Sequence, residues 1–162
     1  VTFLGVARGW WCGWWIATAC LAVLLVAGCA SAPKPAKING KVETSASANP
    51  SASQRPSPLM LRVYELKSAT AFNAADFMSL YQRDQVELAS DFVARDEMTL
   101  APGECRPLSK TLSVETRYLG VVAAYRDLEH ARWRAIAAVE PGKTYKLLIH
   151  ADALAVTIAV NR

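Results

Sequence analysis

Recognisable catalytic and cofactor motifs are absent from this sequence of 162 residues. It has no Gly-rich phosphate loop, no Gly-x-Ser-x-Gly elbow, no Cys-x-x-Cys pair and no His-Glu-x-x-His pattern. Only two histidines occur, His130 and His150. The chain therefore offers few groups for nucleophilic, redox or zinc chemistry, and we predict no enzyme activity, no cofactor and no metal site.

A long apolar segment and a basic cluster are also missing. The apolar run at 16–27 is shorter than the ~20 residues that a membrane-spanning helix needs, which argues against an uncleaved transmembrane helix. The net charge of +4 is spread along the chain, without the clustered lysines and arginines typical of nucleic-acid binding. We therefore expect no nucleic-acid partner.

The end of the apolar run carries the most specific signal in the sequence. Ala27 and Gly28 are small residues directly before Cys29, and a signal peptidase needs such slim residues beside its cut. The pattern is typical of a bacterial lipoprotein signal peptide. We predict that residues 1–28 are removed, that the thiol of Cys29 is lipidated, and that Ala30 directs sorting to the outer membrane.

Cysteine is scarce in the predicted mature chain. Of four cysteines, Cys12 and Cys20 leave with the signal peptide and Cys29 carries lipid. Cys105 is then the only free thiol, so no intramolecular disulfide is expected.

Residues 29–57 are predicted to be a disordered tether behind the lipid. Pro, Ser and Ala dominate this segment, and Ile38 and Val42 are its only large apolar residues. Such a composition buries too little surface to offset its ordering entropy. The folded domain is accordingly expected to occupy 58–162.

The pattern of the domain is mainly that of β-strands. Strict alternation at 59–66 predicts a first strand, and a helical spacing of apolar residues then predicts a helix at 74–82 with Asn73 as its N-cap. The segment 117–125 is apolar on both faces, which is typical of a central strand. Further strands are expected at 132–139, 145–150 and 154–160.

Two Pro-Gly pairs, Pro102-Gly103 and Pro141-Gly142, predict type II turns between these strands, because Gly takes the positive φ that the turn requires. About seven short strands separated by turns predict an all-β sandwich with one helical insertion after the first strand.

The connection at 67–77 is the candidate binding loop. It combines Phe72 and Phe77 with small polar residues. We expect Phe77 to anchor the helix on the sandwich, whereas Phe72 can be either a buried residue or an exposed binding anchor. Exposed aromatic residues flanked by polar groups are typical of protein interfaces.

A set of short motifs runs in order through the predicted domain: 61–68, 71–73, 76–77, 95–97, 102–104, 116–121, and 126–128 through 132–134. Together with the lipidation signal, this set resembles the outer-membrane lipoprotein of the type VI secretion membrane complex, the TssJ (VasD/SciN) family. The resemblance covers nearly all of residues 58–160.

The resemblance implies a transthyretin-like β-sandwich in which a protruding loop between strands one and two binds a partner. The partner in that family is the periplasmic C-terminal region of the large TssM/IcmF-type inner-membrane component, so the lipoprotein ties the trans-envelope complex to the periplasmic face of the outer membrane. No catalysis or cofactor is implied. With the first strand at 59–66, the matching loop positions are Lys67, Ser68, Thr70, Ala71, Phe72, Asn73 and Phe77.

A lipid-anchored periplasmic domain that binds a small ligand or acts as an enzyme is the alternative. It requires a concave polar site that gathers either His150 with Asp152 or Asp127 with Glu129. The assembly lipoprotein requires no deep polar pocket, but a solvent-exposed loop.

Overall fold

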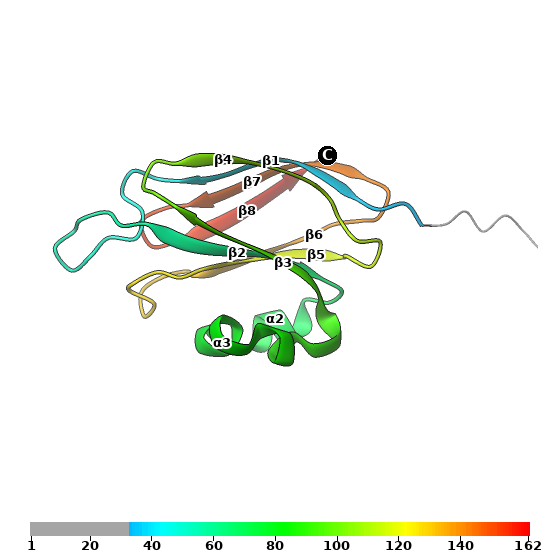
Figure 1. The fold of residues 1–162 in the computed structure, drawn as a ribbon, viewed down its shortest axis with the longest axis horizontal. Coiled ribbons are helices and arrows are strands. Elements are labelled where there is room, and N and C mark those ends of the chain that lie inside the picture. The colour runs from blue at the N-terminus through cyan, green and yellow to red at the C-terminus, as the bar shows by residue number, and fades with distance from the viewer. Residues whose placement is uncertain (1–32) are drawn as a thin grey trace, which may run out of the picture. The chain divides into compact units, whose positions relative to one another are not determined.

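Two four-stranded sheets pack face to face over residues 33–162, the part of the chain that the computed structural model describes (Figure 1). The strand orders are β4-β1-β7-β8 and β3-β2-β5-β6. The strands are β1 (Lys37–Thr44), β2 (Leu59–Leu66), β3 (Phe92–Leu100), β4 (Cys105–Thr111), β5 (Tyr118–Ala123), β6 (Arg134–Ala138), β7 (Thr144–Ala151) and β8 (Val156–Asn161). The predicted all-β sandwich is confirmed. Cys29 and the predicted signal peptide lie outside the described residues.

The first strand lies inside the segment that the sequence predicts to be a disordered tether. β1 pairs antiparallel with β4 and parallel with β7, so both of its backbone edges are hydrogen-bonded. Ile38 and Val42, on one face of β1, are almost fully buried. The predicted tether is therefore wrong from residue 37 onward, and the folded domain does not begin at Pro58. Tertiary pairing and two buried side chains stabilise a strand that composition alone does not reveal.

Close approach between β1 and β7 depends on Gly40. A Cβ atom at this position would lie 1.8 Å from the carbonyl oxygen of Leu147. A side chain cannot be accommodated there without displacing the backbone of one strand. Only glycine therefore fits at this position in the middle of β1.

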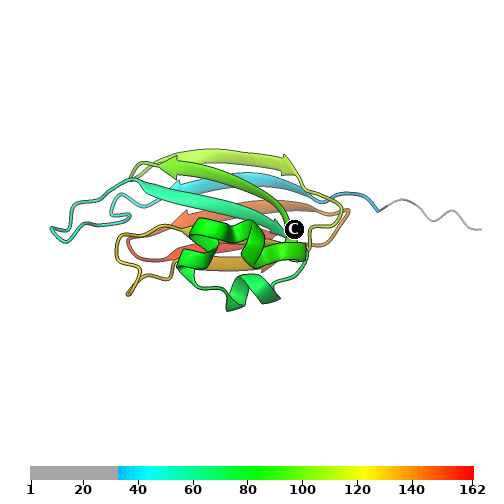
Figure 2. The ribbon, with the colours of Figure 1, turned by 60° about the horizontal axis from the view of Figure 1, so that its bottom comes forward.

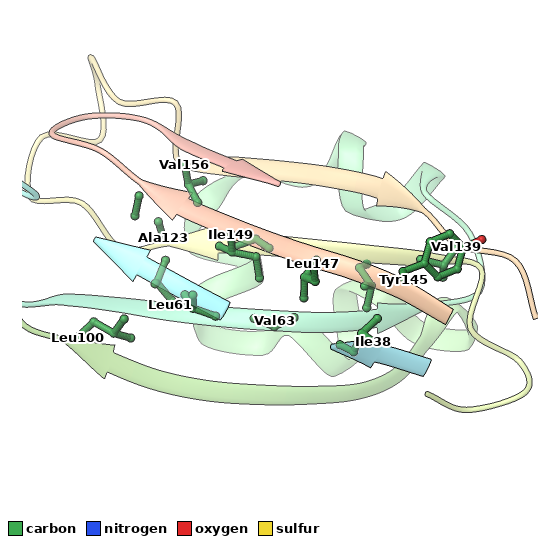
Figure 3. Packing of buried hydrophobic residues seen from close by; sticks show 14 of the residues in the cluster. Ile38, Leu61, Val63, Leu100, Ala123, Val139, Tyr145, Leu147, Ile149 and Val156 are labelled. Carbon is green, nitrogen blue, oxygen red and sulfur yellow. The ribbon is translucent and has the colours of Figure 1, made fainter. Parts of the chain in front are cut away.

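The core lies between the two sheets (Figure 3). β5 is a central strand flanked by β2 and β6, as its two apolar faces predict. The close-up shows side chains from both sheets meeting in one layer. The labelled members are Ile38, Leu61, Val63, Leu100, Ala123, Val139, Tyr145, Leu147, Ile149 and Val156.

An ion-pair network joins the two sheets at the β3–β4 side. Lys110 Nζ of β4 lies 2.8 Å from Glu65 Oε1 of β2 and 2.7 Å from Asp96 Oδ2 of β3. Burial alone would raise the pKa of Glu65. Hydrogen bonds from Lys110, the Ser113 amide and the Thr116 hydroxyl outweigh burial and hold that pKa below its usual value. The bridge therefore stabilises the closed sandwich at neutral pH.

A helical layer covers the outer face of the β3-β2-β5-β6 sheet (Figure 2). It consists of α2 (Thr70–Ala74), α3 (Phe77–Leu88) and a 3-10 turn (Ala89–Asp91). The insertion follows the second strand, not the first, because β1 precedes it. The helix predicted at 74–82 is in fact two helices, separated by the extended backbone of Ala75 and Asp76. Asp76, not Asn73, is the N-cap of α3: its carboxylate accepts a 2.9 Å hydrogen bond from the Ser79 amide.

Polar contacts fix the helical layer to the sheet. The hydroxyl of Tyr64 on β2 donates to Asp84 on α3 over 3.0 Å, and burial raises the pKa of Tyr64 to about 12. Arg62 Nη1 donates to the carbonyl oxygen of Tyr81 over 2.7 Å. The layer is therefore held by hydrogen bonds as well as by apolar packing. None of the helices in the described range combines the length and apolar character needed to cross a bilayer.

The strand directions give the sandwich two distinct ends. β1 begins at Lys37, beside the turn at 139–143, which we call the entry end. β1 finishes at Thr44 at the opposite end, which we call the loop end, and the long projection at 45–58 follows it there (Figure 1). The connections at 101–104, 124–133 and 152–155 lie at the loop end too, as the strand registers require. The chain thus enters at one end and projects its longest loop at the other.

Gly40→Ala tests whether residues 37–44 are a strand or a tether. Because the new Cβ would overlap the backbone of β7, we expect the free energy of unfolding to fall by about 2 kcal/mol or more in denaturant titrations. Ala52→Ser, in the exposed part of the 45–58 loop, is the matched control and is expected to change stability by less than about 0.5 kcal/mol. Equal stability of the Gly40 variant and the parent would contradict the pairing of β1 with β7.

Candidate partner-binding site

The residues predicted to bind a partner, 67–77, follow β2 and form the first part of the helical layer. Of the individual residues predicted to contact the partner, Lys67, Thr70 and Asn73 are exposed. Ser68, Ala71 and Phe77 are partly buried, and Phe72 is fully buried. Lys67 Nζ pairs with Glu115 over 3.0 Å. This segment therefore offers a few polar side chains rather than a protruding aromatic anchor.

Phe72 belongs to the core of the helical layer. Its side chain has no exposed surface, and its ring lies 5.8 Å from that of Tyr64, centroid to centroid. A Cβ atom on Gly120 of β5 would lie 2.8 Å from the ring, so the glycine provides the space that the ring fills. Arg134 Nη1 donates to the Phe72 carbonyl oxygen over 3.1 Å. The view of Phe72 as an exposed binding anchor is therefore wrong.

Phe77 anchors the start of α3 on the sheet, as expected. Its ring contacts Trp133 edge to face and stacks on Tyr81, with centroid distances of 5.4 Å in both pairs. Such aromatic pairs add to the apolar burial that holds a helix on a sheet. Both aromatic residues of the predicted binding loop thus stabilise the fold.

The loop between strands one and two is the segment 45–58, because β1 is the first strand. The assignment of that loop to 67–77 is wrong for the same reason. Residues 52–56 are exposed without interruption, and the loop projects from the body of the sandwich (Figures 1 and 2). Sequence reasoning missed it because the alternation of Ile38, Gly40 and Val42 is short and lies in a Pro- and Ser-rich context.

Hydrogen bonds within the loop give it a defined shape. At its tip, the Ser51 amide donates to the Arg55 carbonyl oxygen, and the Gln54 amide donates to the Ser51 carbonyl oxygen, both over 2.8 Å. At its base, the Ser57 amide donates to the Ala48 carbonyl oxygen over 3.1 Å. The 45–58 loop is therefore a closed turn on a hydrogen-bonded stem rather than a tether.

A cavity of about 660 Å³ lies beside this loop. The loop contributes Pro50, Ser51 and Gln54, and the β5–β6 connection contributes Arg126 and Asp127. The β7–β8 turn contributes Ala153 and Leu154. The wall is a mixture of small, apolar and charged groups. Three connections that are distant in sequence thus meet in one concave surface at the loop end.

The residues of the alternative ligand-binding hypothesis are only partly brought together. Asp127 lines the cavity, but its carboxylate is engaged by His130 Nδ1 over 2.9 Å, and this hydrogen bond lowers the pKa of Asp127. His150 Nδ1 lies 3.3 Å from a carboxylate oxygen of Glu43 on β1. Within residues 33–162, no group of three or more His, Cys, Asp or Glu side chains could hold a metal ion.

The two-sheet sandwich, its helical layer and its end loop define the class of the molecule as a β-sandwich module with a helical insertion. Residues 36–154 match the model of the type VI secretion lipoprotein family, whose members include VasD, EvfM and TssJ. The chain belongs to this family of type VI secretion lipoproteins. The match begins within one residue of β1, in agreement with the fold.

Solved structures agree with this assignment. TssJ1, the type VI secretion lipoprotein of Pseudomonas aeruginosa, is 41% identical, with a TM-score of 0.76 over 79% of this chain and 98% of that one. Lip of Serratia marcescens, a membrane-bound component of the type VI secretion system, is 24% identical, with a TM-score of 0.70 over 77% and 96%. No match was found among curated proteins.

The fold also occurs in a structure described as the TssM C-terminal domain of the type VI secretion system from EAEC. The matched chain is 23% identical, with a TM-score of 0.62 over 76% of this chain and 97% of that one. At this identity the likeness concerns the fold alone.

Phe72→Ala separates a core role from a binding role. Because the ring is fully buried against Tyr64 and Gly120, its removal is expected to lower the free energy of unfolding by about 3–5 kcal/mol. Asn73→Ala, one residue further and exposed, is the control and should change stability by less than about 0.5 kcal/mol. Thermal and denaturant unfolding measure both effects. A stable Phe72 variant would restore the binding-anchor interpretation.

Proposed function

We propose that this protein is an outer-membrane lipoprotein, anchored through lipid on Cys29, whose 45–58 loop binds the periplasmic C-terminal region of the TssM-type inner-membrane component. It would thereby tie the trans-envelope complex of the type VI secretion system to the outer membrane. The family assignment supports membership of this system. The lipidation signal in the sequence supports the anchor.

The observation that carries the proposal is that the described chain enters the sandwich at one end and projects the 45–58 loop at the other. The described chain begins at Pro33 at the entry end, and β1 runs from there to the base of the 45–58 loop (Figure 1). An anchor held at the entry end leaves the loop end free to meet a partner on the side away from the membrane.

The anchor is close to the fold. Ala36 is buried, and its carbonyl oxygen accepts a 2.8 Å hydrogen bond from the Leu112 amide, so the chain is fixed from this residue onward. Seven residue steps separate Cys29 from Ala36, which allows a span of at most about 25 Å. A lipidated Cys29 would therefore hold the entry end within a short distance of the membrane.

The 45–58 loop has the properties of a recognition element. Its tip is exposed while its base is buried and hydrogen-bonded, so the accessible residues are carried on a firm support. A loop whose shape exists before binding loses less conformational entropy when it meets a partner. The exposed members of the predicted site, Lys67, Thr70 and Asn73, form the rival surface that the calorimetric control tests.

Calorimetric titration tests the binding role. The mature chain with Cys29→Ser, titrated with the periplasmic C-terminal region of the inner-membrane component from the same bacterium, should show saturable 1:1 binding. Replacement of 51–55 by Gly and Ser should remove it, because these residues form the exposed tip. A variant with Lys67, Thr70 and Asn73 changed to Ser is the matched control and should bind like the parent. The reverse pattern would move the contact to the helical layer.

Cys29→Ser tests the anchor in cells. The variant should remain an unlipidated precursor by mass spectrometry and should abolish type VI secretion, although its sandwich folds normally. Stable membrane attachment needs several acyl chains, and the variant carries none of them. The loss of secretion should therefore be complete rather than partial. Secretion that persists without lipid would contradict the tethering role.

A further inference from the structure

Asn49 occupies an unusual position at the base of the 45–58 loop. Its backbone has φ of 52°, in the left-handed region that few residues other than glycine and asparagine adopt. Only 3% of the residue is exposed. A buried amide is retained where its hydrogen bonds are satisfied, so the contacts of this side chain show what it does.

Those contacts join three connections at the loop end. Asn49 Nδ2 donates to the Pro58 carbonyl oxygen, at the far end of the same loop, over 2.8 Å. Asn49 Oδ1 accepts from the Arg126 amide, in the β5–β6 connection, over 2.8 Å. The Asn49 amide donates to the Ala153 carbonyl oxygen, in the β7–β8 turn, over 3.1 Å. One residue therefore closes its own loop and attaches it to two neighbours.

The same three connections line the cavity beside the loop. Pro50, which follows Asn49 directly, forms part of one wall, while Arg126 and Leu154 lie in the other two connections. The backbone amide that donates to Asn49 Oδ1 is that of Arg126, a residue of the cavity wall. The geometry of the cavity thus depends on the Asn49 contacts.

The charge of the cavity rim indicates what it can receive. Arg126 is exposed, and within residues 33–162 its guanidinium has neither a hydrogen-bond nor an ion-pair partner. Asp127 beside it is engaged by His130. Among the residues that line the cavity, Arg126 is the one side-chain cation and is available to an incoming carboxylate, whereas the neighbouring Asp127 carboxylate is already hydrogen-bonded to His130.

We propose that Asn49 is a positioning residue that locks the 45–58 loop, the β5–β6 connection and the β7–β8 turn into one preformed concave surface, and that this surface receives a partner segment carrying an acidic side chain opposite Arg126. The inference rests on the proposed binding of the inner-membrane component at this loop. It adds the residue that shapes the site and the charge that the partner must supply.

Asn49→Gly tests the lock without straining the backbone, because glycine accepts the positive φ and only the amide contacts are lost. Hydrogen exchange at 50–56 should accelerate by about tenfold, the factor expected from the loss of two hydrogen bonds. The association rate constant for the periplasmic region of the inner-membrane component should fall in proportion to the fraction of molecules in which the loop is open, since only the closed loop holds the competent conformation. Ser79→Ala, a buried polar residue of α3, is the control for lost stability and should change neither quantity.

Arg126→Glu tests the charge. Binding should weaken by about tenfold or more at low salt, with a smaller loss at high salt. Lys143→Glu makes the same charge change at the entry end, where the exposed side chain is distant from the cavity, and should leave binding unchanged. Equal losses for the two reversals would overturn the assignment of the acidic contact to Arg126.

The outcomes separate this inference from the proposed function. If the parent binds, and Asn49→Gly changes neither the exchange at 50–56 nor the association rate, the lock is overturned while the binding function stands. If the parent does not bind the inner-membrane component at all, the docking surface falls with the proposed function. In that case, hydrogen exchange at 50–56 in the Asn49→Gly variant still tests whether Asn49 holds the loop in place.

Discussion

The arrangement of the whole molecule depends on the insertion of β1 between β4 and β7. This strand completes one sheet and contributes Ile38 and Val42 to the core. It also determines where the chain enters and where its first loop emerges. Because β1 runs parallel to β7 and Gly40 brings their backbones close, its register cannot shift without a steric clash. The end at which the described chain enters and the position of the 45–58 loop follow from this one pairing.

In the proposed function, this pairing separates the anchored end from the binding end. The entry end is connected to Cys29 through a short segment, whereas the loop end carries the 45–58 loop and the cavity beside it. The helical layer covers the outer face of the second sheet and buries Phe72 and Leu80 against it. The helical layer therefore stabilises the fold. The 45–58 loop, at the end opposite the entry, is the proposed partner-binding element.

Much of the fold is predictable from local pattern. The alternation at 59–66 gives β2 its observed bounds, and the two apolar faces of 117–125 identify the central strand β5. Both Pro-Gly pairs place glycine at a positive φ of 76°. These features are predictable because side-chain period and turn chemistry are encoded within a few residues.

The errors arise where tertiary contacts decide the structure. β1 has a weak local signal, and its strand conformation is stabilised by two neighbours that follow much later in the chain. The burial of Phe72 depends on the space left by Gly120, which sequence proximity does not indicate. The missed strand β1 also explains the wrong loop assignment. With 59–66 counted as the first strand, the loop between strands one and two is placed at 67–77 instead of 45–58.

Hydrogen exchange of the mature chain, with and without the periplasmic C-terminal region of the inner-membrane component, tests the central claim most directly. If the loop end is the binding surface, added protection will be confined to 45–58, 124–133 and 152–155, and the helical layer will exchange as in the free protein. Protection that appears instead over 67–77, with none in 45–58, would contradict the division of the molecule into an anchored end and a binding end.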